Sequence, residues 1–146
     1  MRRQHIEIRQ SFDAPVEKVF KVLTEHESFG KVIRKNIKRV VDCQDENKNG
    51  VGSVRRINPF PLPAFEETVT RLEPNRLMEY VVSQGSPIKN HKGRMEFSEE
   101  QGKTILCYTI DFEPKLPFVL FGAILKQAIE KPIRSGIERL AESYHA

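Results

Sequence analysis

The sequence predicts an α+β fold in which a curved antiparallel sheet packs against one long helix. Apolar and polar residues alternate over Ile6–Phe12, and similar alternation recurs in six stretches between Ile37 and Phe112. A stripe of apolar residues at helical spacing then runs from Phe118 to Tyr144. Because sheet and helix must each cover an apolar face, we expect two layers, in a single domain spanning residues 1–146.

The first strand leads directly into two short helices. Asp13 is placed to cap the first helix, and Pro15 fits its first turn. The buried stripe of this helix is expected to contain Val16, Val19, Phe20 and Leu23. A second helix is expected near Ser28–Arg34.

The middle of the chain is expected to form six strands joined by short turns. The expected strands are Ile37–Gln44, Gly52–Asn58, Ala64–Leu72, Arg76–Ser83, Lys89–Phe97 and Thr104–Phe112. Short connections indicate an antiparallel meander, because parallel strands need long crossovers. The alternation leaves the faces of Arg55 and Glu67 open; we expect both at the surface, with a buried ion pair as the alternative.

The chain is expected to end in one long helix from about Pro117 to Tyr144. Pro132 falls inside this helix and is expected to kink it, since proline removes a backbone hydrogen bond. The segment Leu116–Leu125 is apolar nearly all round, which favours burial on more than one side.

The connections differ between the two ends of the meander. Those at one end are short and polar, whereas those at the other are rich in proline and apolar side chains. The apolar residues at that end are Phe60, Leu62, Ile88, Leu116 and Phe118. Clustered apolar side chains on loops indicate a ligand mouth, a membrane contact or a partner surface; alternatively, they close that end of the core.

Composition and charge narrow the function classes. The chain is mildly basic, with a net charge of +4. Its densest basic stretch, Lys31–Arg39, lacks the aromatic residues and motifs of nucleic-acid-binding proteins, so we interpret it as a solvated face and expect no nucleic-acid partner. No metal-ligand spacing or phosphate-binding glycine loop is present, so we expect no metal and no cofactor.

The cysteines and the N-terminus indicate a soluble cytoplasmic protein. Cys43 and Cys107 each fall in an expected strand and are expected to be reduced thiols. The N-terminal residues lack the apolar segment of a signal peptide, and the run Leu116–Leu125 is too short to span a bilayer.

Several motifs in order resemble the START-related helix-grip superfamily, also called SRPBCC or polyketide cyclase/dehydrase-like, which includes the birch-pollen-allergen fold. They are SFDAPVEKVF at Ser11–Phe20, L-x-x-Y-x-V at Leu77–Val82, SPIKNHKGRMEF at Ser86–Phe97, GKTILCYTIDFEP at Gly102–Pro114, and the long final helix. The resemblance covers essentially the whole chain. Many members carry Trp where this chain has Phe20 and Tyr108, and this chain contains no Trp.

The resemblance implies a β-α-α-β6-α helix-grip fold, in which a seven-stranded antiparallel sheet wraps the C-terminal helix and holds a hydrophobic ligand between them. Strand alternation and the apolar start of the helix then give candidate cavity residues: Met78, Tyr80, Val82, His91, Met95, Tyr108, Ile110, Phe118, Phe121 and Leu125. The candidate mouth is formed by Phe60, Leu62, Ile88 and Leu116.

Three functions remain open at this point. The first is noncatalytic binding or transport of a small hydrophobic molecule or lipid. The second is an enzyme of the polyketide cyclase/aromatase type, in which Tyr80, His91 or Tyr108 moves protons; His91 is the weak catalytic candidate. The third is an interaction module whose Phe60, Leu62 and Phe118 meet a protein partner or make a peripheral membrane contact. The sequence indicates no oligomeric state.

Overall fold

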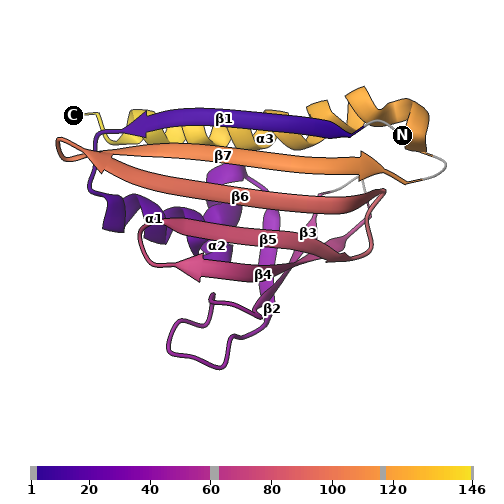
Figure 1. The fold of residues 1–146 in the computed structure, drawn as a ribbon, viewed down its shortest axis with the longest axis horizontal. Coiled ribbons are helices and arrows are strands. Elements are labelled where there is room, and N and C mark those ends of the chain that lie inside the picture. The colour runs from indigo at the N-terminus through magenta and orange to yellow at the C-terminus, as the bar shows by residue number, and fades with distance from the viewer. Residues whose placement is uncertain (1–2, 60–62, 116–117, 146) are drawn as a thin grey trace.

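A computed structural model describes residues 3–59, 63–115 and 118–145, without the side chains of Phe118 and Val119. The elements follow the order expected from the sequence (Figure 1). They are β1 (Gln4–Phe12), α1 (Val16–Thr24), α2 (His26–Ile33), β2 (Asn36–Val41), β3 (Val54–Asn58), β4 (Phe65–Glu73), β5 (Leu77–Gln84), β6 (Ile88–Glu100), β7 (Lys103–Pro114), the 3₁₀ turn η1 (Phe118–Phe121) and α3 (Gly122–Ser143).

The strands form one seven-stranded antiparallel sheet in the order β1-β7-β6-β5-β4-β3-β2. The six later strands form the expected meander, and β1 pairs with the last of them, with Ile6 opposite Ile110 and Ile8 opposite Tyr108. The N-terminal strand is therefore an edge of the sheet, as Figure 1 shows. The helix-grip α+β architecture is confirmed.

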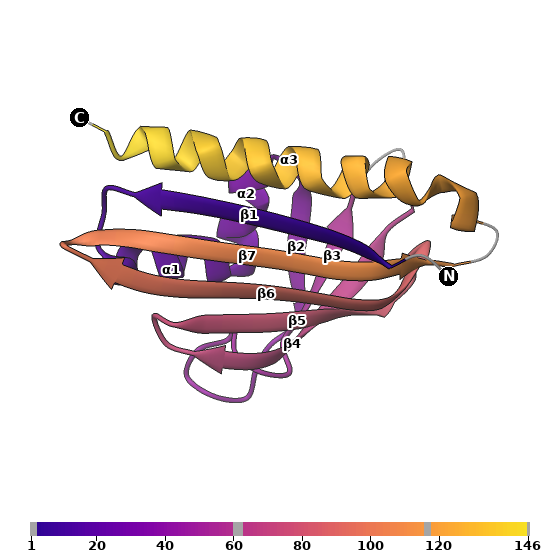
Figure 2. The same ribbon diagram turned by 45° about the horizontal axis from the view of Figure 1, so that its top comes forward.

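Helix α3 runs along β1 and lies across α2 (Figures 1 and 2). Its closest approach to α2 is at Gly136, where a Cβ atom would lie 2.4 Å from the backbone oxygen of Val32. No other residue fits this position without moving one of the helices, since the obstacle is backbone rather than a flexible side chain. Glycine at this point therefore fixes how tightly the two helices pack.

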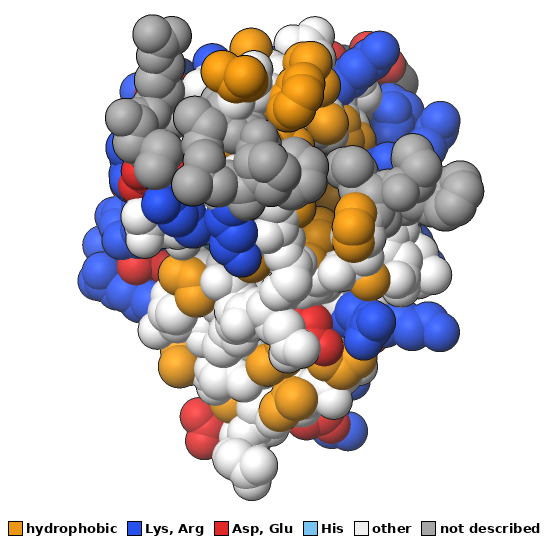
Figure 3. All heavy atoms as spheres, turned by 90° about the vertical axis from the view of Figure 1, so that its right-hand side faces the viewer, with side chains coloured by type: hydrophobic (Ala, Val, Ile, Leu, Met, Phe, Trp, Pro, Cys, Tyr) orange, Lys and Arg blue, Asp and Glu red, His pale blue; other side chains and the backbone are white. Residues whose placement is uncertain are grey.

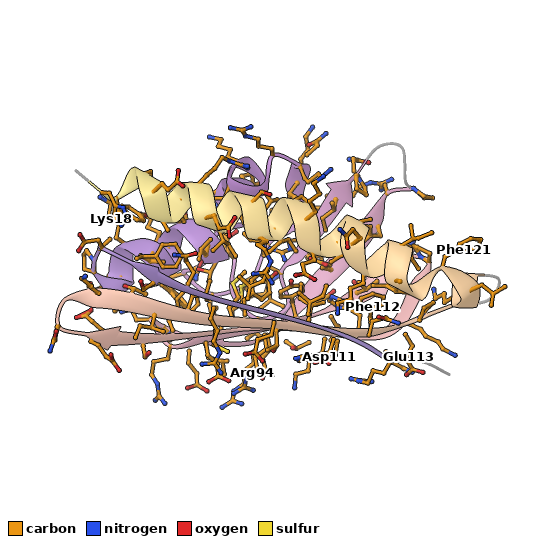
Figure 4. The ribbon with its side chains drawn as sticks, turned by 90° about the horizontal axis from the view of Figure 1, so that it is seen from above. Lys18, Arg94, Asp111, Phe112, Glu113 and Phe121 are labelled. Atoms are coloured by element: carbon orange, nitrogen blue, oxygen red, sulfur yellow. The ribbon has the colours of Figure 1, made fainter. Side chains whose placement is uncertain are left out.

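Strand alternation assigns the faces of the sheet correctly. In β7 the alternate residues Thr104, Leu106, Tyr108, Ile110 and Phe112 are all buried. Figure 4 shows Phe112 between the sheet and α3, whereas Asp111 and Glu113 project from the outer face. The inner faces of β5, β6 and β7 thus supply the core against α1, α2 and α3.

The start of α1 differs from the expectation. Asp13 does not cap the helix; Pro15 occupies the capping position, and no side-chain hydrogen bond caps the helix from there. Instead, the backbone N–H of Val16 donates to Glu99 Oε1 of β6 at 3.2 Å. A carboxylate from a distant strand therefore takes the role expected of a local cap.

The boundaries of three other elements also differ from those expected from the sequence. The second helix begins at His26 rather than Ser28, β2 ends at Val41 rather than Gln44, and β6 continues to Glu100 rather than Phe97. Cys43 consequently lies in a connection, while Cys107 is in β7 as expected; neither forms a disulfide.

The last helix also differs at its start. Pro117 lies outside the described residues, and a 3₁₀ turn at Phe118–Phe121 precedes α3. The helix then continues through Pro132 to Ser143. Proline removes one backbone hydrogen bond without ending the helix, which packs against both α2 and β1.

Candidate functional site: a cavity between the sheet and the last helix

A cavity of about 110 Å³ lies between α3 and the inner face of the sheet. Its lining comes from α2, α3 and strands β2 to β7, and most of it is apolar. The lining residues are Phe29, Ile33, Lys35, Ile37, Arg55, Ile57, Pro59, Phe65, Glu67, Tyr80, Val82, Ile88, His91, Ile110, Ala128, Ile129, Pro132 and Ile133. The cavity reaches the surface at half-buried Lys35 and Pro132 and exposed Ala128, and all three also line a surface groove along α3.

The main polar feature of the cavity is a buried ion pair between neighbouring strands. Arg55 of β3 and Glu67 of β4 are directly opposite in the sheet, and Arg55 Nε donates to Glu67 Oε1 at 2.8 Å. The Arg55 guanidinium also lies 4.5 Å from the centre of the Tyr80 ring and 5.0 Å from that of Phe29. Both aromatic faces stabilise a cation that has lost its water.

Arg55 is nevertheless incompletely satisfied. Its side chain is 1% exposed, and its Nη1 atom has no hydrogen-bond partner among the described residues. Burial is the largest single effect and disfavours the charge, but the surrounding groups, led by the Glu67 carboxylate, together outweigh it and raise the pKa of Arg55. The cavity wall therefore contains a permanently charged donor whose hydrogen-bonding capacity is only partly used.

His91 enters the cavity through a β-bulge. The register of β6 against β7 shifts between Lys89 and Lys92, so that Ile88 and His91 both face inward although they are three residues apart. His91 Nδ1 accepts a hydrogen bond from the backbone N–H of Val82 at 3.0 Å. Nδ1 is therefore unprotonated, and the ring proton of neutral His91 is on Nε2.

The environment of His91 favours its neutral form. Burial lowers its pKa, and the Arg55 charge acts in the same direction, against the Glu67 carboxylate. The Nε2 atom lies 4.0 Å from Glu67 Oε2, which is too long for a hydrogen bond. His91 is thus a second donor in the cavity wall beside the same carboxylate.

Two tyrosines separate the cavity from the solid part of the core. The Tyr80 and Tyr108 hydroxyls are hydrogen-bonded to each other, and burial raises the pKa of both groups. The Tyr80 ring lies flat over Gly93 of the next strand, where a Cβ atom would be 2.2 Å from the tyrosine Cζ atom. Glycine at this position therefore lets the two hydroxyls meet.

Only some of the residues predicted for the cavity and its mouth line the cavity in the structure. Tyr80, Val82, His91 and Ile110 line the cavity, as does Ile88, which we expected at the mouth. Met78, Met95, Tyr108 and Leu125 are buried but lie outside the lining, and Phe121 is half exposed at the surface. Phe60, Leu62 and Leu116 lie outside the described residues, as does the side chain of Phe118.

Sequence reasoning placed Arg55 and Glu67 at the surface, and this expectation is wrong, since both are buried. The alternation contained a signal for the pair. Arg55 shares a strand face with Ile57, and Glu67 shares one with Val69, both of which are buried. Opposite charges at inward positions of adjacent strands are the pattern of a buried pair. The contributions of α2, namely Phe29 and Ile33, depend on how the helix packs and were also missed.

Neither a membrane-spanning helix nor a metal-binding cluster is found in the described part of the chain. None of its helices is long and apolar enough to cross a membrane. No cluster of three or more His, Cys, Asp or Glu residues within the described ranges is arranged to hold a metal ion.

Comparison with solved structures supports the fold. Norcoclaurine synthase from Thalictrum flavum, in a complex with dopamine and hydroxybenzaldehyde, matches with a TM-score of 0.70 at 11% identity, over 99% of this chain and 89% of that one. The Aha1 dimer from Colwellia psychrerythraea matches with a TM-score of 0.67 at 17% identity, over 97% of this chain and 96% of that one. Ara h 8.0201 matches with a TM-score of 0.64 at 15% identity, over 96% of this chain and 99% of that one. At such identities these likenesses show the fold alone.

Comparison of the sequence itself identifies the family. No curated protein matches the chain. The family model described as polyketide cyclase / dehydrase and lipid transport, however, matches residues 3–144, which is nearly the whole chain. With the seven-stranded sheet around α3, this shows that the chain belongs to that family, within the helix-grip superfamily.

Proposed function

We propose that the protein binds and carries a small hydrophobic molecule in the cavity between the sheet and α3, without transforming it. The observation that supports this most directly is the cavity itself, an apolar space with a few polar groups on one wall. Ligand sites in proteins commonly have this composition. The membership of a family described by lipid transport agrees with such a role.

The size of the cavity favours a small molecule over a whole lipid. An apolar cavity of roughly 150 Å³ holds a benzene molecule, whereas typical drug-sized ligands occupy roughly 300–1,000 Å³. At about 110 Å³, the interior is smaller than this and accepts a short aliphatic chain or part of a ring. A longer ligand extends past Ala128 and Pro132 into the surface groove along α3.

The geometry of the three candidate proton-transfer groups favours binding over catalysis. Tyr80 and Tyr108 are hydrogen-bonded to each other, and their raised pKa values keep both phenols protonated near neutral pH. His91 Nδ1, the basic nitrogen of the neutral ring, is already occupied by the Val82 N–H. A general base needs a free basic atom facing the ligand, and this ring presents its N–H instead.

Binding of ethylbenzene, followed by NMR chemical-shift titration, tests the proposal. The substitution Ala128→Trp places a bulky ring where the cavity meets the surface and is expected to abolish binding. Ala123→Trp is the matched control, because Ala123 is another exposed alanine on α3 that lines the groove but not the cavity. If wild type shows no saturable shifts at cavity residues, or if both variants bind alike, the proposal fails.

A second candidate is a peripheral contact between the start of α3 and an anionic membrane. Leu120, Phe121 and Ile124 are 91%, 49% and 66% exposed, and Figure 3 shows hydrophobic side chains gathered at this end of α3 with basic side chains to both sides. Lys35 and Lys131 line the adjoining groove. Apolar tips flanked by lysines suit a surface of anionic headgroups over hydrocarbon.

Co-sedimentation with vesicles containing phosphatidylglycerol tests this contact. Ile124→Asp is expected to reduce binding several-fold, because it removes an apolar contact and adds repulsion. Val51→Asp is the matched control, since Val51 is 51% exposed but lies in the connection between β2 and β3. Equal binding of both variants, or absence of binding by wild type, removes the membrane contact from consideration.

A further inference from the structure

The polar wall of the cavity presents two hydrogen-bond donors that have no acceptor among the residues the structure describes. Arg55 Nη1 is buried without a partner among the described residues. His91 carries its proton on Nε2, and Glu67 Oε2 is 4.0 Å away, beyond hydrogen-bonding distance. Arg55 and His91 both line the same cavity. Buried donors are nearly always paired, so these two identify a place for an acceptor.

The charges of Arg55, Glu67 and His91 sum to zero before any ligand arrives. Arg55 contributes one positive charge, Glu67 one negative charge, and His91 is neutral because burial lowers its pKa. A ligand carboxylate would add a negative charge beside Glu67 in an enclosed apolar space. The only other cation of the described lining, half-buried Lys35, lies at the opening to the surface, where water screens its charge. A neutral oxygen with lone pairs, as in a carbonyl group, accepts from both donors without this penalty.

The other lining residues indicate what kind of ligand bears this carbonyl oxygen. Ile37, Ile57, Val82, Ile110 and Ile129 are among the aliphatic lining residues. The volume of about 110 Å³ accommodates a group no larger than a small ring next to the donors. The acceptor therefore belongs to the end of the ligand that enters first, with an apolar body behind it.

We propose that Arg55 Nη1–H and His91 Nε2–H bind the carbonyl oxygen of an uncharged hydrophobic ligand. The inference rests on the proposed ligand-binding function and names the chemical class that the cavity selects. Glu67 acts as a positioning residue, because its hydrogen bond to Arg55 Nε holds the guanidinium with Nη1 free.

Three probes of similar size test the selection by isothermal titration calorimetry. Acetophenone carries a neutral carbonyl, ethylbenzene has no acceptor, and benzoate carries a charge. We expect wild type to bind acetophenone more tightly than benzoate. We also expect the preference for acetophenone over ethylbenzene to fall about tenfold or more when the donor is removed.

The donor is removed in the double variant Arg55→Met/Glu67→Leu, which replaces the ion pair by apolar side chains of similar volume and so avoids an unpaired buried charge. The matched control is Arg56→Met/Glu66→Leu, because these residues are also directly opposite each other on β3 and β4 and their side chains are more exposed. The control is expected to keep the wild-type preference.

The outcomes separate this inference from the proposed function. If ethylbenzene binds in a way that Ala128→Trp blocks, but the ion-pair variant keeps the same preference for acetophenone, only the carbonyl inference is overturned. Tighter binding of benzoate than of acetophenone also overturns it. If neither neutral probe binds wild type, the proposed function fails as well.

An infrared measurement on wild type keeps the test valid even if the double variant does not fold. The carbonyl stretch of bound acetophenone, labelled with ¹³C at the carbonyl, is expected to move to lower frequency than in hexane, because hydrogen bonds weaken the C=O bond. A band at the hexane position shows that the carbonyl meets no donor and overturns the inference.

Discussion

The same three strands build a solid half and a hollow half of the interior. In β7, Leu106 is packed in the core, whereas Ile110 borders the cavity. In β5, Met78 is fully buried and Val82 lines the cavity, and in β6 the corresponding residues are Met95 and His91. The hydrogen-bonded Tyr80 and Tyr108 lie between the two halves.

The difference between the halves lies in what fills the space between sheet and helix. The solid half is filled by long or branched apolar side chains such as Leu106, Met78 and Met95. The hollow half has the Arg55–Glu67 pair and His91 on its wall. Apolar neighbours cannot collapse onto these groups without costing hydrogen bonds, so polar side chains keep a cavity open that apolar ones would fill.

The largest expected effect is in the hollow half. Glu67→Gln leaves the Arg55 charge buried without a counter-ion, which is expected to cost about 3–5 kcal/mol in the free energy of unfolding. Glu66→Gln serves as control, because the ion pair of Glu66 with Arg56 is long, at 3.8 Å, and partly exposed. This substitution is expected to cost about 0–1 kcal/mol in the free energy of unfolding. Urea denaturation measures both. Similar losses for the two variants would contradict the assignment of a buried pair.

Shortening side chains on one strand compares the two halves directly. Leu106→Ala removes a side chain enclosed on all sides and is expected to cost about 2–5 kcal/mol. Ile110→Ala is expected to cost about 1 kcal/mol less, because one side of Ile110 already faces the cavity and has fewer contacts to lose. Denaturation of both variants in urea measures the difference, and a larger cost at Ile110 would show that the two halves are packed alike.

Acid is expected to destabilise the protein through its buried histidines. His26, which bonds to Ser53 beside the ion pair, has its pKa lowered to about 3 by burial, with Arg55 and Arg39 acting in the same direction. The unfolded chain binds this proton near pH 6.5, so stability is complete above that pH and declines as the pH falls toward 3. At pH 5 the loss is about 2 kcal/mol from His26, and His91 adds to it because its pKa is also lowered.

Denaturation at pH 7.5 and pH 5 measures this loss in variants. His26→Gln is expected to flatten the dependence on pH. His5→Gln is the control, because His5 is exposed and Asp111 raises its pKa; its contribution to stability has the opposite sign and is present at low pH. The loss on acidification should therefore be at least as steep in this control as in wild type. A wild-type stability that does not change between the two pH values would exclude buried neutral histidines.

The smallest expected effect is in the solid half, at the start of α1. Glu99→Ala removes the acceptor of the Val16 N–H and is expected to cost about 1 kcal/mol, the usual contribution of a helix N-cap. Glu100→Ala on the exposed end of the same strand is the control and should change stability little. Thermal unfolding distinguishes the two; equal melting temperatures would show that Glu99 does not cap the helix.

The fold was predictable because its signals are local and repeated. Alternation identified the inward faces of β1 and β7, and apolar spacing identified α1 and α3, each over many residues. The site was predictable only in part. Tyr80, Val82, His91 and Ile110 follow from alternation once a cavity is assumed, but alternation alone does not separate them from Met78 and Met95, which share the same faces and lie in the solid half.

The sequence by itself determined the order of elements, the antiparallel meander, the inward faces and the family. Only the tertiary structure decided which inward residues border empty space, that Arg55 and Glu67 are buried, and that Glu99 caps a helix from 83 residues away. The physical reason is the range of each interaction. Periodicity records which way a side chain points, whereas burial, pairing and cavity volume depend on what the opposite layer brings to the same place.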